Sequence, residues 1–415
     1  MSHSVEHVLI VGAGLAGLRT AEELRRAGYE GEITLLGDED RAPYDRPPLS
    51  KQFVRGETDD TALRPSEFFQ ENRIDLRLGV AATGVDTGAR QVTLSDGSTL
   101  GYDRLVIATG LRPRRIPSFP QARGVHVLRT HDDAAGLREH LGTAQRAVVI
   151  GAGFIGCELT ASFRERGVDV VLVEPQPTPL AAALGEQIGA LVARMHLEEG
   201  VDVRCGVGVE SLLTTATDDD SNSVSAQTNT DNSALEDAAV RGVRLSDGSV
   251  VEADLVVVGV GSVPVTDWLA GSDIPLAAPA DGGGVLTDEV GRTGVDGVWA
   301  LGDVAAWRLG TGRNRRVEHW TNAGEQAQLL AGALLGVNHP AAVHVPYVWS
   351  DQYNVKIQVL GNPGLADEVR IIEDQGRKFL AHLFRAGTLV AVVGAGMTGK
   401  VMKMRAQLAG AQPVA

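Results

Sequence analysis

The chain is 415 residues long, enough for two or three domains with a substantial core, and its hydrophobic content of 43% is ordinary for a globular protein. It carries 38 Lys and Arg against 53 Asp and Glu, a net charge of -15 that argues against a nucleic-acid partner but leaves local docking of an acidic protein open. No apolar run is long enough to span a bilayer and no signal-peptide pattern is visible, so we expect a cytoplasmic protein with no membrane partner.

The first predicted element is a buried parallel strand over 8–11, followed at once by a Gly-x-Gly-x-x-Gly motif and an amphipathic helix. Gly12 would make the tight turn, Gly14 would let the backbone approach a pyrophosphate, and Gly17 would allow close helix–strand packing. The anion would then lie against free N–H groups at the helix N-terminus. An isolated motif is as often only a tight turn, but here the flanking strand and helix favour dinucleotide binding.

The second strand of this unit is predicted over 33–36, and acidic residues follow it. An acid at this place binds the ribose hydroxyls in dinucleotide-binding folds. Because the strand end itself is Gly37, we assign this role to Asp38, with Glu39 as its alternative. Two solvated loop acids are the remaining interpretation.

A proline-rich segment over 41–51 comes next, and its prolines fix φ and stiffen the loop. The segment would hold Arg46 and Lys51 in defined places, where two cations suit contacts to a pyrophosphate and a flavin. Strands are then predicted over 74–78, 91–94 and 100–108, with a hairpin turn at 95–98.

A buried strand over 105–110 ends in residues with little side-chain bulk, which would let the backbone press against a ligand. The proline-punctuated segment 111–117 then predicts a crossing to a second domain. The run over 255–261 repeats the pattern of 105–110 and predicts that the chain returns there to its first domain. The residues expected to present backbone to a ligand are Ala108, Thr109, Gly110 and Gly261.

The strand–glycine–helix pattern recurs over 147–156, with Gly151, Gly153 and Gly156 at the motif positions. Because the motif occurs twice, it is much stronger evidence for dinucleotide binding than a single match would be. Two dinucleotide folds in one chain predict two dinucleotides bound together, FAD and a nicotinamide dinucleotide.

Glu174 stands directly at the end of the second strand of this repeat, predicted over 170–173. A carboxylate there accepts ribose hydroxyls and repels a 2′-phosphate. Since 175–179 offers no Lys or Arg to hold that phosphate, we expect NADH rather than NADPH.

Residues 214–237 are dominated by Ser, Thr, Asn and Asp, and cannot bury enough apolar surface to offset the entropy of ordering. We expect a flexible loop between two strands of the NADH domain with no catalytic role, rather than a metal or partner site. The strands that flank a turn at 246–249 repeat the earlier hairpin, which supports two related halves.

Two aromatic or acidic candidates lie in the last third of the chain. Asp303 follows a strand and would accept a hydroxyl of the ribityl chain of FAD, or would cap a helix. Trp320 precedes a helix predicted over 325–335 and would contact the edge of the flavin ring, with core packing as its alternative. From about residue 347, strand-like alternation and a hairpin at 375–376 predict a third domain.

The two cysteines, Cys157 and Cys205, are far apart in sequence, so a catalytic disulfide of the flavoprotein disulfide-reductase type is not expected. Both are interpreted as small buried hydrophobic residues. His339 and His344 show no metal-ligand spacing, and we expect no metal site.

Several segments carry a family resemblance beside the two glycine motifs. They are Arg-Ala-Pro-Tyr-Asp-Arg-Pro-Pro-Leu-Ser-Lys at 41–51, Ala-Thr-Gly at 108–110, Leu-Arg-Thr-His-Asp-Asp-Ala at 128–134, Leu-Gly-Asp at 301–303, Glu-His-Trp-Thr-Asn-Ala at 318–323 and Trp-Ser-Asp-Gln-Tyr at 349–353. Over nearly its whole length the chain resembles the FAD-dependent NADH:ferredoxin reductases of bacterial monooxygenase and dioxygenase systems, of the putidaredoxin reductase type.

The resemblance implies an α/β, glutathione-reductase-like fold with two Rossmann-like dinucleotide-binding domains and a C-terminal α+β domain. The implied FAD domain is discontinuous and comprises 1–112 and 264–336. The NADH domain comprises 113–263, including the insert 214–237, and the C-terminal domain comprises 337–415.

The resemblance further implies hydride transfer from NADH to FAD, then single-electron transfer to a [2Fe–2S] ferredoxin that feeds a cytochrome P450 or a ring-hydroxylating dioxygenase. Lys51 and Glu158 would flank the site of hydride transfer, although an ordinary solvated acid is the alternative for Glu158. The implied FAD-lining residues are Ala16, Asp38, Arg46, Lys51, Arg129, Asp303 and Trp320. The implied NADH-binding residues are Gly151, Gly153, Ile155, Gly156 and Glu174.

A local basic cluster is the candidate docking site for an acidic ferredoxin, with a solvated loop as the alternative. It comprises Arg308, Arg313, Arg315 and Arg316, shortly before Trp320. The segment 394–400 departs from the family pattern. The resemblance therefore does not indicate how the C-terminal end contacts the partner. Without disulfide chemistry there is no need for an obligate dimer, and a monomer or weak dimer is expected.

Other functions remain open on the sequence alone. A rubredoxin reductase or an electron-transfer module for nitrite reduction would share the same flavin core. A redox sensor that binds FAD and NADH to switch partners is the non-enzyme alternative. Acceptor preference and the rate of acceptor turnover distinguish these possibilities.

Overall fold

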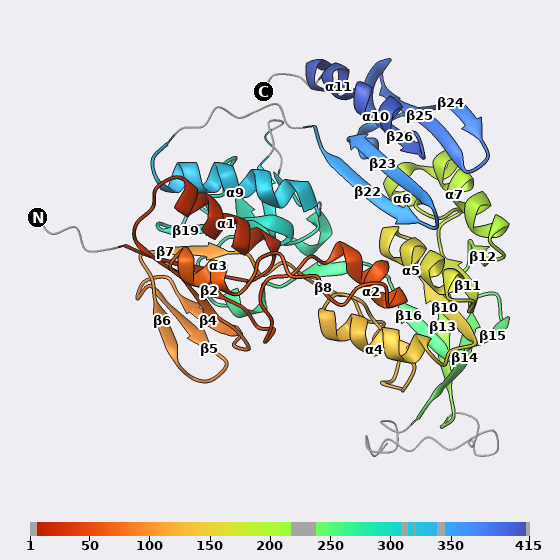
Figure 1. The fold of residues 1–415 in the computed structure, drawn as a ribbon, viewed down its shortest axis with the longest axis horizontal. Coiled ribbons are helices and arrows are strands. Elements are labelled where there is room, and N and C mark those ends of the chain that lie inside the picture. Colours follow the sequence, from red (N-terminus) through yellow and green to blue (C-terminus); the bar gives the residue numbers. More distant parts are fainter. Residues whose placement is uncertain are drawn as a thin grey trace, which may run out of the picture.

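Two parallel sheets of the same design organise the described part of the chain (Figure 1). The structure is a computed structural model and describes residues 6–216, 238–308, 312, 314–318, 320–337 and 345–411. The first sheet has the order β19 (Val298–Ala300), β7 (Arg104–Ile107), β1 (His7–Val11), β2 (Glu32–Leu36) and β3 (Ile74–Arg77). The second has the order β12 (Asp202–Cys205), β11 (Asp169–Glu174), β10 (Arg146–Ile150), β16 (Leu255–Val258) and β9 (Val125–His126).

The central strand of each sheet is followed at once by a glycine loop and a helix, as the repeat predicts. β1 pairs in parallel with β2 and β7, and β10 pairs in parallel with β11 and β16. The strands are continuous apolar runs because both of their faces are buried. The helices that follow are α1 (Leu15–Arg26) and α5 (Phe154–Glu165).

The chain crosses between the two lobes twice, and the two crossings pair with each other. β8 (Leu111–Pro113) lies antiparallel to β17 (Ser262–Pro264). After β17 the chain returns to the first sheet and adds β19 at its edge beside β7. The crossing expected at 111–117 contains β8, whereas the return comes with β17, just after the run 255–261, because β16 within that run still belongs to the second sheet.

Each lobe also carries a three-stranded antiparallel sheet that turns at a Ser-Asp-Gly-Ser sequence, as predicted. These are β4 (Ala82–Asp86), β5 (Gln91–Leu94) and β6 (Thr99–Gly101) in the first lobe, and β13 (Val209–Thr214), β14 (Val240–Leu245) and β15 (Val250–Glu252) in the second. The predicted insert lies between β13 and β14, and its residues 217–237 lie outside the described residues. A further small sheet joins β18 (Val285–Thr287), β20 (Ala305–Arg308) and β21 (Asn314–Arg315).

Two predicted element bounds are wrong. The single strand expected over 100–108 is two strands, β6 and β7, because Asp103 leaves the ladder and accepts a hydrogen bond from the backbone N–H of His7 at 2.7 Å. The helix expected over 325–335 is α9 (Trp320–Leu334), which begins five residues earlier and lies beside α1. Its first turn contains Trp320, whose helix propensity is low but whose Nε1 donates to Asp45 in a distant segment of the chain.

The C-terminal domain is built on one antiparallel sheet with the order β22 (Tyr347–Gln352), β23 (Val355–Gly361), β26 (Thr388–Ala395), β25 (Lys378–Arg385) and β24 (Glu368–Gln375). The predicted hairpin at 375–376 is present between β24 and β25. This sheet shares a hydrophobic core with the second lobe, and α5 lies between them (Figure 1). A helix covered on both sides is buried all round, which is why α5 is buried from Gly156 to Phe163.

Seven further α-helices belong to the described residues. They are α2 (Gln52–Arg55), α3 (Glu67–Glu71), α4 (His131–Leu141), α6 (Ala181–Leu184), α7 (Glu186–Glu198), α10 (Thr398–Lys403) and α11 (Arg405–Ala411). Within the described ranges, none of the helices has both the length and the apolar character needed to cross a membrane.

Candidate functional site

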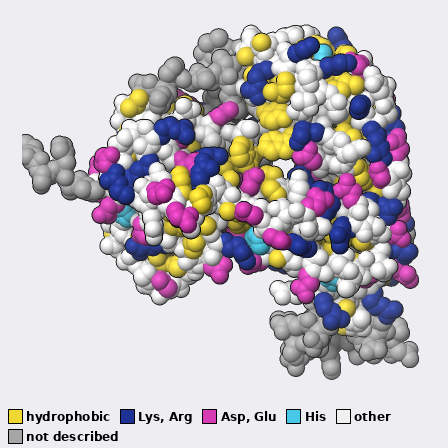
Figure 2. All heavy atoms as spheres, viewed as in Figure 1, with side chains coloured by type: hydrophobic (Ala, Val, Ile, Leu, Met, Phe, Trp, Pro, Cys, Tyr) yellow, Lys and Arg dark blue, Asp and Glu magenta, His cyan; other side chains and the backbone are white. Residues whose placement is uncertain are grey.

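A cavity of about 540 Å³ lies between the two parallel-sheet lobes. Both glycine motifs contribute to its wall, and so do residues of β22 in the C-terminal sheet. Figure 2 shows the molecule hollowed near its middle, with hydrophobic side chains beside the hollow. One cavity therefore joins the two dinucleotide motifs.

The three glycines of the first motif have distinct physical constraints. Gly12 has φ +118°, and a Cβ there would lie 2.2 Å from the carbonyl oxygen of Ala108. A Cβ on Gly17 would lie 2.0 Å from the carbonyl oxygen of Gly12. Gly14 is different, because its φ of −89° suits any residue and a Cβ would meet no protein atom within 4 Å. The protein itself therefore needs glycine at Gly12 and Gly17, whereas Gly14 leaves open space on the cavity side.

In the second motif, too, two glycines have no room for a Cβ and the third has open space. A Cβ on Gly151 would lie 2.4 Å from the carbonyl oxygen of Gly259, and one on Gly156 would lie 1.9 Å from that of Gly151. Gly153 again meets nothing within 4 Å and has an ordinary φ of −72°. A bare backbone surface at the N-terminus of a helix suits a pyrophosphate, so the geometry of both motifs fits a dinucleotide.

Most of the predicted site residues line this one cavity. From the first lobe these are Gly12, Gly14, Ala16, Asp38, Arg46, Lys51, Ala108, Thr109, Gly110, Asp303 and Trp320. From the segment after the crossing they are Arg129, Gly153, Ile155, Gly156, Glu158 and Gly261. Gly17, Gly151 and Glu174 are not part of the lining, and the two glycines act instead through the close packing described above.

The two acids considered for ribose binding have different surroundings. The carboxylate of Glu39 accepts hydrogen bonds from Tyr44 Oη at 2.6 Å and from Arg46 Nη2 at 2.9 Å. Burial raises the pKa of Tyr44 well above its usual value, which keeps its hydroxyl protonated as the donor. Asp38 is exposed at the cavity, and its Oδ1 accepts only the N–H of Glu39 among the described contacts. The geometry favours Asp38 over Glu39 for a ligand.

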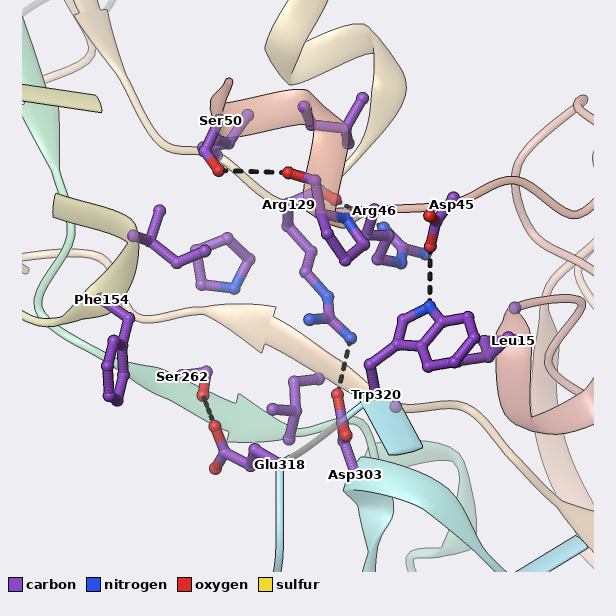
Figure 3. A pocket seen from close by; sticks show the side chains of 18 of the residues that line it. Leu15, Asp45, Arg46, Ser50, Arg129, Phe154, Ser262, Asp303, Glu318 and Trp320 are labelled. Carbon is purple, nitrogen blue, oxygen red and sulfur yellow. Dashed lines mark hydrogen bonds and ion pairs between the residues drawn. The ribbon is translucent and has the colours of Figure 1, made fainter. Parts of the chain in front are cut away.

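Arg129 and Asp303 form a pair in the cavity wall, with Nη2 and Oδ2 3.2 Å apart (Figure 3). Asp303 lies in a 3₁₀ turn, Gly302–Val304, and caps no helix, so the alternative of a helix cap is wrong. Burial lowers the pKa of Arg129, and the nearby charge of Arg46 adds to this lowering. The Nε of Arg129 is shielded from solvent and has no partner among the described residues. An unsatisfied donor of this kind suits an oxygen-rich ligand.

Trp320 lines the cavity from the first residue of α9. Its Nε1 donates to Asp45 Oδ1 at 2.8 Å (Figure 3), and its ring meets Trp349 edge-on at a centroid distance of 6.2 Å. Both tryptophans line the cavity, so the aromatic wall combines α9 of the first lobe with β22 of the C-terminal sheet. Trp349 belongs to a motif quoted for the family resemblance, but the sequence did not assign it a role.

The centre of the site is an ion pair between Lys51 and Glu158, with Nζ and Oε2 2.6 Å apart. The two residues are only 5% and 3% exposed, so the alternative of a solvated acid at Glu158 is wrong. Ser50 Oγ donates to Glu158 Oε2 at 2.5 Å, and Ser350 Oγ donates to Oε1 at 2.8 Å. Lys51 also donates to the carbonyl of Pro47 at 3.0 Å. The pair therefore joins the first lobe, α5 of the second lobe and the C-terminal sheet.

Sequence reasoning missed the two serines of this network. Ser50 directly precedes Lys51 in the segment 41–51, and Ser350 lies inside the motif 349–353, so both stood in recognised motifs. Nothing in their local sequence shows that their hydroxyls meet on one carboxylate 108 and 192 residues away.

Glu174 ends β11 beside the second glycine loop, as predicted. Its Oε2 accepts the N–H of Ala152 at 2.7 Å, and its Oε1 accepts the N–H of Gln176 at 3.0 Å. These bonds fix the carboxylate next to the loop. A fixed negative charge at this position is suited to accept ribose hydroxyls and to repel a 2′-phosphate.

The predicted basic cluster is not a single exposed face. Arg315 is exposed on β21, and Arg308 is exposed at the end of β20. Arg316, in contrast, is only 12% exposed, pairs with Glu318 at 2.8 Å and donates to the carbonyls of Gly282 and Asp303. Arg313 lies outside the described residues, as do the two histidines at 339 and 344.

The two cysteines differ in burial, and neither forms a disulfide in the described structure. Cys157 is fully buried as predicted, and burial raises the pKa of its thiol well above the usual value. Cys205 is only half-buried, which corrects the prediction, and burial raises its pKa to about 11. Neither sulfur has the low pKa of a reactive thiol.

Comparison with known proteins identifies two domain models. A model described as pyridine nucleotide-disulphide oxidoreductase matches residues 6–327, and one described as reductase C-terminal matches residues 347–415. Rhodocoxin reductase from Rhodococcus erythropolis is 37% identical over 366 residues, 87% of this chain and 79% of that protein. The ferredoxin–NAD(+) reductase component of the p-cumate 2,3-dioxygenase system of Pseudomonas putida is 35% identical over 95% of this chain and 90% of that protein.

Solved structures of reductases also superpose on nearly the whole chain. The covalent putidaredoxin reductase–putidaredoxin complex superposes with a TM-score of 0.87 at 30% identity, over 99% of this chain and 95% of that chain. The ferredoxin reductase of the CYP199A2 system from Rhodopseudomonas palustris gives a TM-score of 0.85 at 33% identity, over 96% and 93% of the two chains.

Proposed function

This chain belongs to the pyridine nucleotide-disulphide oxidoreductase family with a reductase-type C-terminal domain, and on that basis we propose that it is a FAD-dependent NADH:ferredoxin reductase. The resemblance and fold class predicted from the motifs are confirmed. The proposed FAD domain comprises 1–112 and 264–336, the NADH domain 113–263 and the C-terminal domain 337–415.

The observation that supports this function is the position of the Lys51–Glu158 pair. Lys51 follows the first glycine motif in sequence and belongs to the lobe assigned to FAD, whereas Glu158 lies on the helix of the second motif. The ion pair is therefore in the wall of the cavity that both dinucleotides would enter. A two-electron donor and its acceptor can meet only at such a shared place.

Each part of the chain has a separate task in this proposal. FAD, when bound, accepts a hydride from NADH and passes single electrons to the ferredoxin. The first glycine loop, Asp38 and the Arg129–Asp303 pair bind and orient FAD, while the second loop and Glu174 bind NADH. Lys51 supplies a buried positive charge, and Glu158 holds its ammonium in place. Trp320 and Trp349 exclude water from one side of the cavity.

A titration under anaerobic conditions tests this function directly. We expect NADH to bleach the flavin absorption of the purified protein, and an oxidised [2Fe–2S] ferredoxin to restore it. Restoration by rubredoxin alone would indicate a rubredoxin reductase, and restoration only by a nitrite-reducing partner would indicate an electron-transfer module. Bleaching with no turnover of any acceptor would favour a redox sensor. Absence of a flavin band after reconstitution with FAD would contradict the proposal.

Glu174 is expected to set the preference for NADH. In Glu174→Gln the side chain can still accept the N–H of Ala152, but the negative charge facing a 2′-phosphate is lost. We expect the ratio of kcat/KM for NADH over NADPH to fall by about tenfold, equivalent to roughly 1.4 kcal/mol of lost discrimination. Glu174→Asp retains the charge and should keep most of the preference. An unchanged ratio in Glu174→Gln would show that another group excludes NADPH.

We propose that the ferredoxin has a [2Fe–2S] cluster, that it feeds a cytochrome P450 or a ring-hydroxylating dioxygenase, and that it docks beside the exposed Arg315. Arg315 lies on β21, and its guanidinium is near Gly364 of the C-terminal domain, so a partner there would contact two domains. Arg308 is a second exposed candidate, whereas the internal contacts of Arg316 make it unsuited to docking. The reductase itself would act as a monomer or weak dimer.

Charge reversal tests this docking site. In Arg315→Glu we expect the second-order rate of ferredoxin reduction at low salt to fall by about five- to tenfold, because electrostatic steering acts mainly on association. The difference should shrink at high salt, and flavin reduction by NADH should be unchanged. Arg370→Glu is the matched control, because Arg370 is an exposed arginine on β24, away from β21, and pairs with Glu368 of its own strand. Equal effects of both reversals would contradict a local docking site at Arg315.

A further inference from the structure

The carboxylate of Glu158 is held by donors from separate parts of the chain. Lys51 and Ser50 contact Oε2 at 2.6 and 2.5 Å, and both belong to the first lobe. Ser350 contacts the other oxygen, Oε1, at 2.8 Å from β22. The C-terminal sheet therefore supplies a hydrogen bond to an oxygen that the first lobe does not reach.

Ser350 lies on the face of β22 that packs against α5, where both it and Gln352 are completely buried. Gln352 is two residues further along the same face, and its Nε2 donates to Ser350 Oγ at 3.2 Å. Because this bond uses the hydroxyl as an acceptor, the hydroxyl proton remains for Glu158. The amide of Gln352 therefore determines that Ser350 Oγ accepts a hydrogen bond from Gln352 and donates one to Glu158.

The strand that carries Ser350 is anchored on both sides. Thr321 of α9 donates to the carbonyl of Tyr347 at 3.0 Å, at the start of β22. Just beyond its end, the hydroxyl of Tyr353 forms a 2.8 Å hydrogen bond with Nδ1 of His196 on α7. Burial lowers the pKa of His196 to about 4, so this contact involves a neutral imidazole near pH 7. These contacts tie β22 to the first lobe at one end and to the second lobe at the other.

We infer that Ser350 is a positioning residue through which the C-terminal domain orients the Glu158–Lys51 pair for hydride transfer. This role rests on the proposed function of the pair. A carboxylate held at one oxygen can rotate about its last torsion, and donors on both oxygens remove that freedom. The ammonium of Lys51, which is bound to the carboxylate, is then fixed as well. The small hydroxyl of a serine fits here because its carboxylate partner offsets the cost of burying it.

Anaerobic stopped-flow measurements on Ser350→Ala test this role. The variant loses one charge-assisted hydrogen bond and leaves Oε1 unsatisfied, so we expect the limiting rate of flavin reduction to fall by about three- to tenfold. The FAD content and the dissociation constant for NAD⁺, measured by equilibrium titration, should change by less than about twofold, since uniform binding is not affected. Ser350→Thr retains the hydroxyl and should restore most of the rate.

Thr321→Val is the matched control, because it removes a hydroxyl that contacts the same strand without touching Glu158. We expect its limiting rate to stay close to that of the wild type, because the backbone ladder to β23 still holds β22 without the Thr321 hydroxyl. The visible absorption spectrum of the bound flavin is a readout independent of turnover, and it should shift in Ser350→Ala but not in Thr321→Val. If Ser350→Ala does not fold, Ser350→Cys, with similar volume and a weaker donor, should show the same loss of rate at unchanged NAD⁺ binding.

The outcomes separate this inference from the proposed function. Wild-type flavin that NADH does not reduce would overturn the proposed function, and the role of Ser350 with it. Normal reduction of the wild type, with rates in Ser350→Ala and Ser350→Cys that equal those of Thr321→Val, would overturn the positioning role alone. A loss of rate that Ser350→Thr does not restore would also overturn it, since the hydroxyl would then not be the cause.

Discussion

Gly153→Ala is expected to yield a folded protein that retains its flavin but is no longer reduced efficiently by NADH. Gly153 has an ordinary φ of −72°, and the added methyl group meets no protein atom within 4 Å. The fold therefore does not need glycine there. A methyl group would instead occupy the surface on which a pyrophosphate lies, and we expect NADH to bind at least about tenfold more weakly, a loss of roughly 1.4 kcal/mol or more.

Gly14→Ala is the counterpart in the first motif. Here too the backbone is unstrained and the space is open, so the protein should fold. If the first lobe binds FAD, this variant should be purified with little flavin, while Gly153→Ala should be purified yellow. The measurements are the ratio of visible to ultraviolet absorption and the dissociation constants of FAD and NADH.

Gly136→Ala on α4 is the control for this pair, because its added methyl group also meets nothing within 4 Å and the residue lies outside both motifs. It should be neutral or slightly stabilising, since alanine favours a helix over glycine. Loss of flavin in Gly153→Ala with flavin retained in Gly14→Ala would reverse the assignment of the two lobes. Wild-type binding of both ligands in both variants would show that neither loop holds a pyrophosphate.

Lys51→Met should have the largest effect on the reductive step. The substitution removes the buried positive charge in the wall shared by the two motifs and leaves the carboxylate of Glu158 without its ion pair. We expect flavin reduction by NADH to slow by about 100-fold or more, the usual consequence of removing a preorganised charged group from a water-excluded site. Stopped-flow reduction at saturating NADH measures this effect.

The same variant should also be less stable. Breaking a buried ion pair from one side typically costs about 3–5 kcal/mol, because the remaining charge is uncompensated. The double variant Lys51→Met with Glu158→Gln should therefore lose less stability than the sum of the two single changes. Urea unfolding of the four proteins measures this difference.

Lys400→Met is the matched control, since Lys400 pairs with Glu373 at the exposed surface of the C-terminal domain. An exposed pair contributes about 0–1 kcal/mol, so the stability and the flavin reduction of this variant should remain near those of the wild type. A Lys51→Met protein that NADH reduces at the wild-type rate would contradict the proposed place of hydride transfer.

The sequence alone was sufficient for the parts of this protein that depend on local constraints. Gly12 and Gly151 need a positive φ, and their spacing from Gly17 and Gly156 is set by contacts within a few residues of chain. Strand–loop–helix units and Ser-Asp-Gly-Ser hairpins are local in the same sense. For this reason the doubled motif, the crossings and the family resemblance could all be predicted before the structure.

Predictions failed or stayed open where a distant segment decides the outcome. Asp303 was compatible with a helix cap until Arg129, 174 residues away, provided its partner. Arg316 was predicted as part of the docking cluster, but its contacts with Gly282 and Glu318 hold its guanidinium against its own lobe. Glu39 was an alternative for ribose binding until Tyr44 and Arg46 occupied its carboxylate.

The residues around the carboxylate of Glu158 show most clearly which features depend on local sequence and which depend on tertiary packing. The family resemblance named Lys51 and Glu158 together, and each of them stands in a segment that can be recognised from local sequence alone. Only the packing of the C-terminal sheet on α5 brought Ser350 to the second oxygen of Glu158 and buried the pair. Burial and hydrogen-bond partners are properties of surfaces that meet across the fold, and no local pattern specifies them.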